Sequence, residues 1–172
     1  MERRNAWKDY TKKELKEMEK EEKKETVESE MNAEVKKTAQ TFRSVYMKEK
    51  SELNTLKVKR KIINCLEEKG YAAVDCDNQI DMVNREKVEE FCKAAEKEEQ
   101  AAVDIVVVFD EGEIIQYHLE SMNGKINVRL CQVKWKDNSP QANYYDEYEA
   151  YEWKYTEKGY LFLEEYQPPG FD

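Results

Sequence analysis

The sequence predicts an α+β fold in which N-terminal helices precede an antiparallel β-meander of about five strands, with the helices packed on one face of the sheet. Residues 1–52 are dominated by Lys and Glu, whereas β-branched and aromatic residues gather after residue 101. Within that second part, Asn123-Gly124 separates two alternating runs, which is the strongest short-range signal of a β-hairpin. The helical and β-rich parts of the chain are thus separate in the sequence.

The first predicted helix spans about residues 8–50, a stretch without Gly or Pro. Only its second half has side chains at spacings of four and three that align on one face, namely Met31, Val35, Thr38, Phe42 and Val45. The first half is rich in interleaved Lys and Glu and either projects or pairs with another chain. We therefore expect a charged helical extension at residues 1–40, followed by a single α+β domain at residues 41–172.

Two shorter helices are expected next. One runs from about residue 52 to 69, where Gly70 takes the left-handed position that commonly follows a helix. The other runs from about residue 85 to 100, with Asn84 as its N-cap. Residues 71–76 between them are predicted to form a short strand.

The sheet begins where the period of the apolar residues changes from about 3.6 to about 2. Val103–Phe109 is a continuous run of mostly β-branched residues, which is typical of a strand covered on both faces. If Met122 faces Lys125 across the Asn-Gly turn, the register of the hairpin follows, with His118 opposite Arg129.

The last two strands are predicted at Tyr144–Tyr155 and Tyr160–Tyr166, after a loop at residues 136–140. Carboxylates interleave with aromatic rings here, a combination that suggests glycan binding or hydrolysis. The candidate ligand surface, whose aromatic members would share one face of an ideal strand, consists of Tyr145, Glu149, Tyr151 and Trp153. The alternative is that the charges prevent further strand pairing and the aromatic rings cover the sheet.

The single histidine lies near a cysteine in the predicted hairpin. The register places Cys131 diagonally across from His118 on the same face, which is a nucleophile arrangement in principle. Diagonal neighbours are about 7 Å apart, too far for a direct hydrogen bond. A surface histidine beside Arg129 is therefore the favoured interpretation, and no catalytic residue is predicted.

A series of acidic residues precedes the third helix. Asp75, Asp77 and Asp81 cluster there, and Glu86 stands where the last ligand of a calcium loop beginning at Asp75 would stand. That motif needs Gly at its sixth position, which is Ile80 here. These four carboxylates are weak candidate metal ligands, and a turn with a helix cap is the favoured alternative. No cofactor is predicted.

The composition argues against several function classes. A net charge of -9 and a pI near 5.0 argue against a nucleic-acid partner, because phosphate binding needs clustered Lys and Arg. The sequence has neither an apolar run long enough for a membrane span nor the apolar stretch of a secretory signal, so the chain as given is expected to be soluble. The four cysteines show no C-x-x-C spacing and are expected to be reduced, structural thiols.

Three blocks of sequence carry a family resemblance: AVDCDNQIDMVN at residues 73–84, VEEFC at residues 88–92, and YTEKGYLFLEEY at residues 155–166. They resemble an uncharacterised family of gut clostridial proteins, many of which look like secreted lipoproteins, and the likeness covers about residues 40–172. The resemblance implies an extracytoplasmic, membrane-anchored location. In proteins of that family the segment similar to residues 168–172 continues into a second domain, so the chain is expected to be either a fragment or a shortened member. It implies no reaction.

From these observations we expect a non-enzymatic binding or interaction module of an envelope-associated protein. One alternative is a carboxylate-dependent hydrolase acting on glycans, which requires a cleft with two carboxylates near Asp146 and Glu149. Another is a cytosolic regulatory or immunity-type partner protein, which requires the stripe from Met31 to Val45 to be buried between chains. We expect a protein partner, or self-association through the N-terminal helix, and no nucleic-acid partner.

Overall fold

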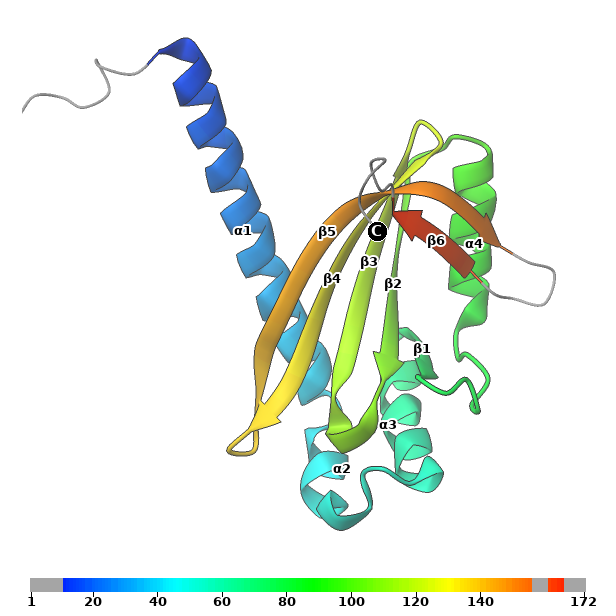
Figure 1. Ribbon diagram of the computed structural model, residues 1–172. Helices are drawn as coiled ribbons and strands as arrows, with labels where there is room; N and C mark the ends of the chain where they lie inside the picture. The colour runs from blue at the N-terminus through cyan, green and yellow to red at the C-terminus, as the bar shows by residue number, and fades with distance from the viewer. Residues whose placement is uncertain (1–10, 156–160, 166–172) are drawn as a thin grey trace, which may run out of the picture.

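Figure 1 shows the protein as a computed structural model in which residues 11–155 and 161–165 are described. Six strands form one sheet in the order β1-β2-β3-β4-β5-β6. The elements in chain order are α1 (Lys12–Gln40), α2 (Arg43–Lys48), η2 (Lys50–Glu52), α3 (Leu56–Glu68), β1 (Ala72–Asp75), α4 (Arg85–Glu96), β2 (Ala101–Val108), η3 (Asp110–Gly112), β3 (Ile114–Met122), β4 (Lys125–Lys136), β5 (Ser139–Tyr155) and β6 (Leu161–Glu165). The predicted α+β class is confirmed, since β2 to β6 form an antiparallel meander. The strand β1 is added parallel to β2.

The hairpin of β3 and β4 has the predicted register. Met122 lies opposite Lys125, and His118 lies opposite Arg129. Asn123 and Gly124 have φ angles of 55° and 80°, as a type I′ turn requires. This turn therefore fixes which side chains of the two strands share a face.

A second tight hairpin joins β4 to β5, where the sequence predicted a longer loop. The strands pair up to Lys136 and Ser139, and the turn between them is formed by Asp137 and Asn138. Both turn residues have positive φ, at 51° and 65°. Asp and Asn tolerate this conformation better than most residues do, so they can replace the more usual Asn-Gly pair.

The predicted first helix is interrupted before its end. The helix α1 stops at Gln40, and Phe42 leaves helical geometry with a φ of -115° before α2 begins. Phe42 is fully buried and packs edge-on against Trp135, with ring centroids 5.9 Å apart. Insertion of this ring into the core accompanies the break.

The shorter helices also start differently from the expectation. The helix α3 begins at Leu56, because the Thr55 hydroxyl caps it by accepting from the Val58 N–H at 3.3 Å. Asn84 precedes α4 as predicted, but its side chain makes no cap bond. Its amide instead donates to the Tyr71 carbonyl at 2.9 Å.

Helices pack against both faces of the sheet, whereas the sequence analysis placed them on one. Ile105 and Val106 are neighbours on β2 and belong to different apolar clusters, because successive strand residues point to opposite faces. Residues of α1 and α3 join the cluster of Val106, and residues of α4 join that of Ile105. Figure 1 shows α1 and α4 on either side of the sheet.

The long strand β5 changes the face to which its alternate residues point. Tyr145 packs against the α1 cluster, whereas Trp153 and Tyr155 pack against the α4 cluster. The pairing with β6 shifts between Ala150 and Glu152, and a shift of one residue inverts the alternation. The expectation that Tyr145 and Trp153 share a face is therefore wrong.

Candidate functional site

The helix α1 packs on the sheet only through its second half. Met31 and Val35 are buried in the core, whereas residues 12–26 are exposed apart from the half-buried Leu15 and Met18. Figure 1 shows the N-terminal half of α1 leaning away from the sheet. The part of α1 from Met31 onward therefore belongs to the packed unit, and only the preceding part projects from it.

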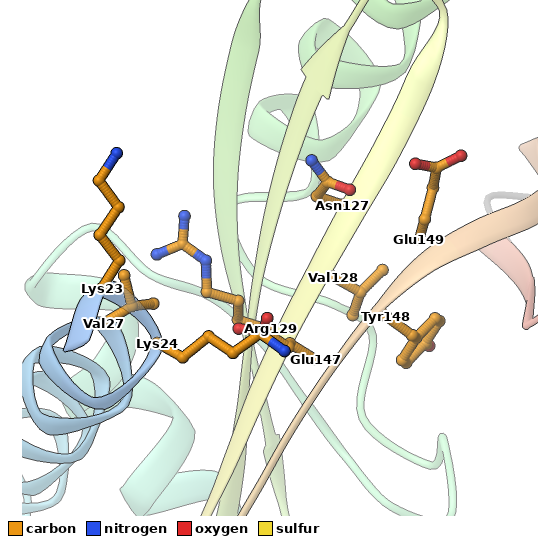
Figure 2. Close-up of a pocket in the computed structure, with 9 residues that line it drawn as sticks. All are labelled: Lys23, Lys24, Val27, Asn127, Val128, Arg129, Glu147, Tyr148 and Glu149. Carbon is orange, nitrogen blue, oxygen red and sulfur yellow. The ribbon is translucent and has the colours of Figure 1, made fainter. Parts of the chain in front are cut away.

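A groove lies where α1 and the sheet diverge, and we call it the α1 groove. Its volume is about 360 Å³. It is lined by residues of α1, β4 and β5, shown in Figure 2: Lys23, Lys24, Val27, Asn127, Val128, Arg129, Glu147, Tyr148 and Glu149. Lysines on the helix thus face glutamates on the sheet, with Arg129 between them.

The side chains of the sheet next to this groove form a charged row. Asp104 lies opposite His118, His118 lies opposite Arg129, and Arg129 lies opposite Glu147. These four residues come from four adjacent strands and share one face of the sheet, because directly opposed residues point to the same side. This is the face against which α1 packs, and we call it the α1 face. The neighbouring row at Cys131 and Tyr145 packs instead beneath the second half of α1.

His118 is held by two carboxylates. Its Nδ1 lies 2.7 Å from Asp104 Oδ1, and its Nε2 lies 2.9 Å from Glu120 Oε1. The hydrogen bond to Asp104 is the largest influence and raises the pKa of His118, against partial burial, which lowers it. Arg129 Nη2 donates to the same Glu120 oxygen at 2.9 Å. The charged form of the imidazole donates from both nitrogens and completes this network.

The predicted pair of His118 and Cys131 is not arranged for nucleophilic catalysis. Both ring nitrogens of His118 are engaged by carboxylates. The Cys131 thiol is buried and donates to Asn32 Oδ1 at 3.2 Å. Burial also raises the pKa of the thiol to about 11. A thiolate nucleophile is therefore disfavoured at this position.

The candidate ligand surface on β5 is divided by the structure. The half-buried Tyr145 donates its hydroxyl to Glu147 Oε2 at 2.7 Å, and burial followed by this bond raises the pKa of the phenol. Glu149 is exposed beside the α1 groove and lies 3.6 Å from Lys125 Nζ. Trp153 is on the other face of the sheet, and the side chain of Tyr151 lies outside the described residues. Of the members of the predicted set whose side chains are described, only Glu149 lines the groove.

The candidate calcium ligands do not converge. Asp75 is 1 % exposed, and its carboxylate accepts from the backbone N–H groups of Asp77, Gln79 and Ile80 at 3.2, 3.3 and 2.7 Å. Asp81 is exposed, and Glu86 lies in the first turn of α4. Among residues 11–155 and 161–165, no group of three His, Cys, Asp or Glu side chains is placed to hold a metal ion. Asp75 serves instead to order the loop after β1.

Sequence reasoning missed Asp104, Glu120 and the two lysines of the groove. Asp104 had a usable signal, because it is the lone acid within the β-branched strand Ala101–Val108. An acid in such a strand needs a partner on its own face. Lys23 and Lys24 carried no signal, because lysines occur throughout the exposed half of α1.

The role of Asp75 can be tested by stability. Asp75→Ala removes the acceptor of three backbone N–H groups, so we expect the free energy of unfolding to fall by about 1–3 kcal/mol. Asp81→Ala, an exposed neighbour, should change it by less than about 0.5 kcal/mol. Calcium at about 1 mM should leave the urea midpoint of the wild type unchanged. A midpoint that rises with calcium in the wild type and not in Asp75→Ala would contradict this account.

The network of His118 predicts a pH-dependent contribution to stability. Because folding raises the pKa of His118, this contribution is fully present below the unfolded pKa of about 6.5 and is lost as the pH rises through the folded pKa. Urea denaturation should show the wild type more stable than His118→Gln by about 1 kcal/mol near pH 6, with a smaller difference near pH 9. A difference that stays constant or grows with pH would show that the charged imidazole does not stabilise the sheet.

Comparison with known proteins assigns the chain to a family. No curated protein and no solved structure shows significant similarity to the chain. None of the described helices combines the length and apolarity needed to cross a bilayer. A family of unknown function, DUF6070, matches residues 24–172, a range that contains the whole sheet and every residue of the α1 groove except Lys23. The expected resemblance to an uncharacterised family is thus confirmed, and the chain belongs to the DUF6070 family of unknown function.

Proposed function

We propose that the protein is a non-enzymatic binding module of an envelope-associated protein and that it contacts a partner protein through the α1 groove. The observation that carries the proposal is the open wedge between α1 and the charged row. Lys23 and Lys24 stand on one wall, and Glu147 and Arg129 stand on the other. Both signs of charge are therefore presented to one occupant.

The geometry of the groove suits binding better than hydrolysis. Its floor consists of strands, which hold side chains more rigidly than loops do. Arg129 is oriented by Glu120, and arginine is enriched among the residues that dominate protein interfaces. The carboxylates near the predicted hydrolytic site already have partners, since Asp146 accepts from the Glu147 N–H and Glu149 approaches Lys125.

The proposed location rests on the sequence resemblance. The blocks at residues 73–84, 88–92 and 155–166 resemble gut clostridial proteins that often look like secreted lipoproteins. We propose the same compartment for this chain. Fractionation of cells that express the complete gene tests it, because an envelope protein sediments with membranes and a cytosolic one stays in the supernatant.

The cytosolic regulatory or immunity-type alternative loses the surface on which it was based. It required the stripe from Met31 to Val45 to be buried between chains. Met31, Val35 and Phe42 are instead buried against the sheet of their own chain. Self-association through α1 would therefore use its exposed half, and within the described residues that half presents mainly Lys and Glu.

Site-specific photocrosslinking in the native host tests the groove. A photoreactive residue at the exposed Asn127 should give a discrete adduct, whereas one at the exposed Glu86 on α4 should not. The crosslinked partner, once purified, should bind Arg129→Glu at least about tenfold more weakly than the wild type by calorimetry. Lys134→Glu, an exposed charge reversal on the same strand, should bind like the wild type. Equal losses in both variants, or adducts only at Glu86, would contradict the proposed groove.

A further inference from the structure

Among the described residues, the outer edge of β5 has a strand partner only in its C-terminal part. On the inner side, β4 pairs with β5 from Ser139 to Ala150. On the outer side, β6 pairs only from Ala150 to Tyr155. Within residues 11–155 and 161–165, no strand lies along the outer side of residues 139–149. This is a long stretch of open edge for a sheet of this size.

A local hydrogen bond supports the assignment of this edge. The Glu147 N–H donates to the side chain of its neighbour, with the Asp146 Oδ1 atom 2.9 Å away. An N–H that pointed into the ladder would donate to a carbonyl of the adjacent strand. The amide of Glu147 is therefore directed outward. The Asp146 carboxylate occupies the place where a carbonyl of an added strand would accept this N–H.

The groove along this edge is strongly acidic. It has a volume of about 400 Å³ and is lined by residues of α1 and β5: Glu21, Lys24, Glu25, Glu28, Tyr145, Asp146 and Glu147. Among the described residues, none of the ion pairs involves Glu21, Glu25, Glu28 or Asp146. Five carboxylates and one ammonium group thus line the edge groove, which carries an excess of negative charge.

The other face of the edge offers an aromatic surface. Tyr144 is 54 % exposed and lies opposite Gln132, on the side of the sheet away from α1. A strand added beside β5 would therefore present one row of side chains to the carboxylates and the alternate row to Tyr144. The complementary sequence alternates Lys or Arg with apolar residues.

The same charges discriminate between partners. Pairing the edge with that of a second copy would bring the acidic stretch with Asp146, Glu147 and Glu149 close to the same stretch of the second copy, and like charges on neighbouring strands destabilise a sheet. A basic strand would be attracted by the same residues. Electrostatic repulsion thus disfavours pairing between two copies of this edge and favours a partner strand of opposite charge.

We propose that residues 139–149 of β5 accept an extended basic segment of the partner protein as an added strand. This inference rests on the proposed binding function and specifies the chemistry of the partner. Main-chain hydrogen bonds to the open edge supply affinity, and the acidic groove selects Lys and Arg. The α1 groove and the edge groove are both lined by Lys24 and Glu147, so the two would form one continuous contact surface.

The test uses a synthetic eight-residue peptide that alternates Lys and Val, with a Glu-Val peptide as its matched control. The Lys-Val peptide should bind the full chain, protect the amides of residues 139–149 from hydrogen exchange, and bind several-fold more weakly as salt screens the charges. The Glu-Val peptide should not bind. Glu147→Pro removes the outward N–H and should weaken binding at least tenfold relative to Glu147→Ala, which removes only the carboxylate.

Two results would overturn the inference. One is a Lys-Val peptide that leaves the exchange of β5 unchanged in the wild type, a measurement independent of how any variant folds. The other is an Asp146→Asn/Glu149→Gln variant that self-associates while the wild type does not bind the Lys-Val peptide. The acidic residues would then only prevent pairing between copies of the chain. If either occurs while the partner still binds in an Arg129-dependent manner, the added strand is wrong and the proposed function stands.

Discussion

The second half of α1 can bury its apolar side chains only where the sheet beneath it is apolar. Met31, Val35 and Ala39 lie there in one apolar cluster with residues of β3 and β4. The Thr38 hydroxyl lies 2.6 Å from Gln116 Oε1 in the same buried interface and fixes the position of the helix on the sheet. Toward the N-terminus of α1, the face of the sheet beneath the helix becomes charged. Contact there would bury no apolar surface, so this half of the helix extends away from the sheet.

Both proposed contact surfaces follow from this change along one face of the sheet. The α1 groove opens where the charged row begins, and His118 bound to Asp104 and Glu120 keeps that row ordered. The edge groove opens beside the same helix, because β6 covers only the C-terminal part of β5. In the proposed contact these charges are suited to recognition because side-chain partners hold them in fixed positions, as Glu120 holds Arg129.

Features set by neighbouring residues could be predicted from the sequence, whereas features set by distant ones could not. The two-residue turn at Asn123-Gly124 fixes the hairpin register, so the pairing of His118 with Arg129 followed directly. The pairing of Asp104 with His118 depends on a turn at η3 in which Glu111 has a φ of 62°, a conformation that the sequence does not specify. The change of face along β5 depends on a one-residue shift against β6, and alternation alone cannot reveal such a shift.

Native-state hydrogen exchange along α1 tests most directly whether the helix contacts the sheet through its second half alone. Buried helical amides exchange only through large-scale unfolding, whereas amides of an exposed helix exchange through local fraying. We expect protection close to the global free energy of unfolding for the amides between Met31 and Gln40, and exchange at least about tenfold faster for those between Lys16 and Glu25. Uniform strong protection along the whole helix would contradict this expectation, because the α1 groove would then be closed in solution.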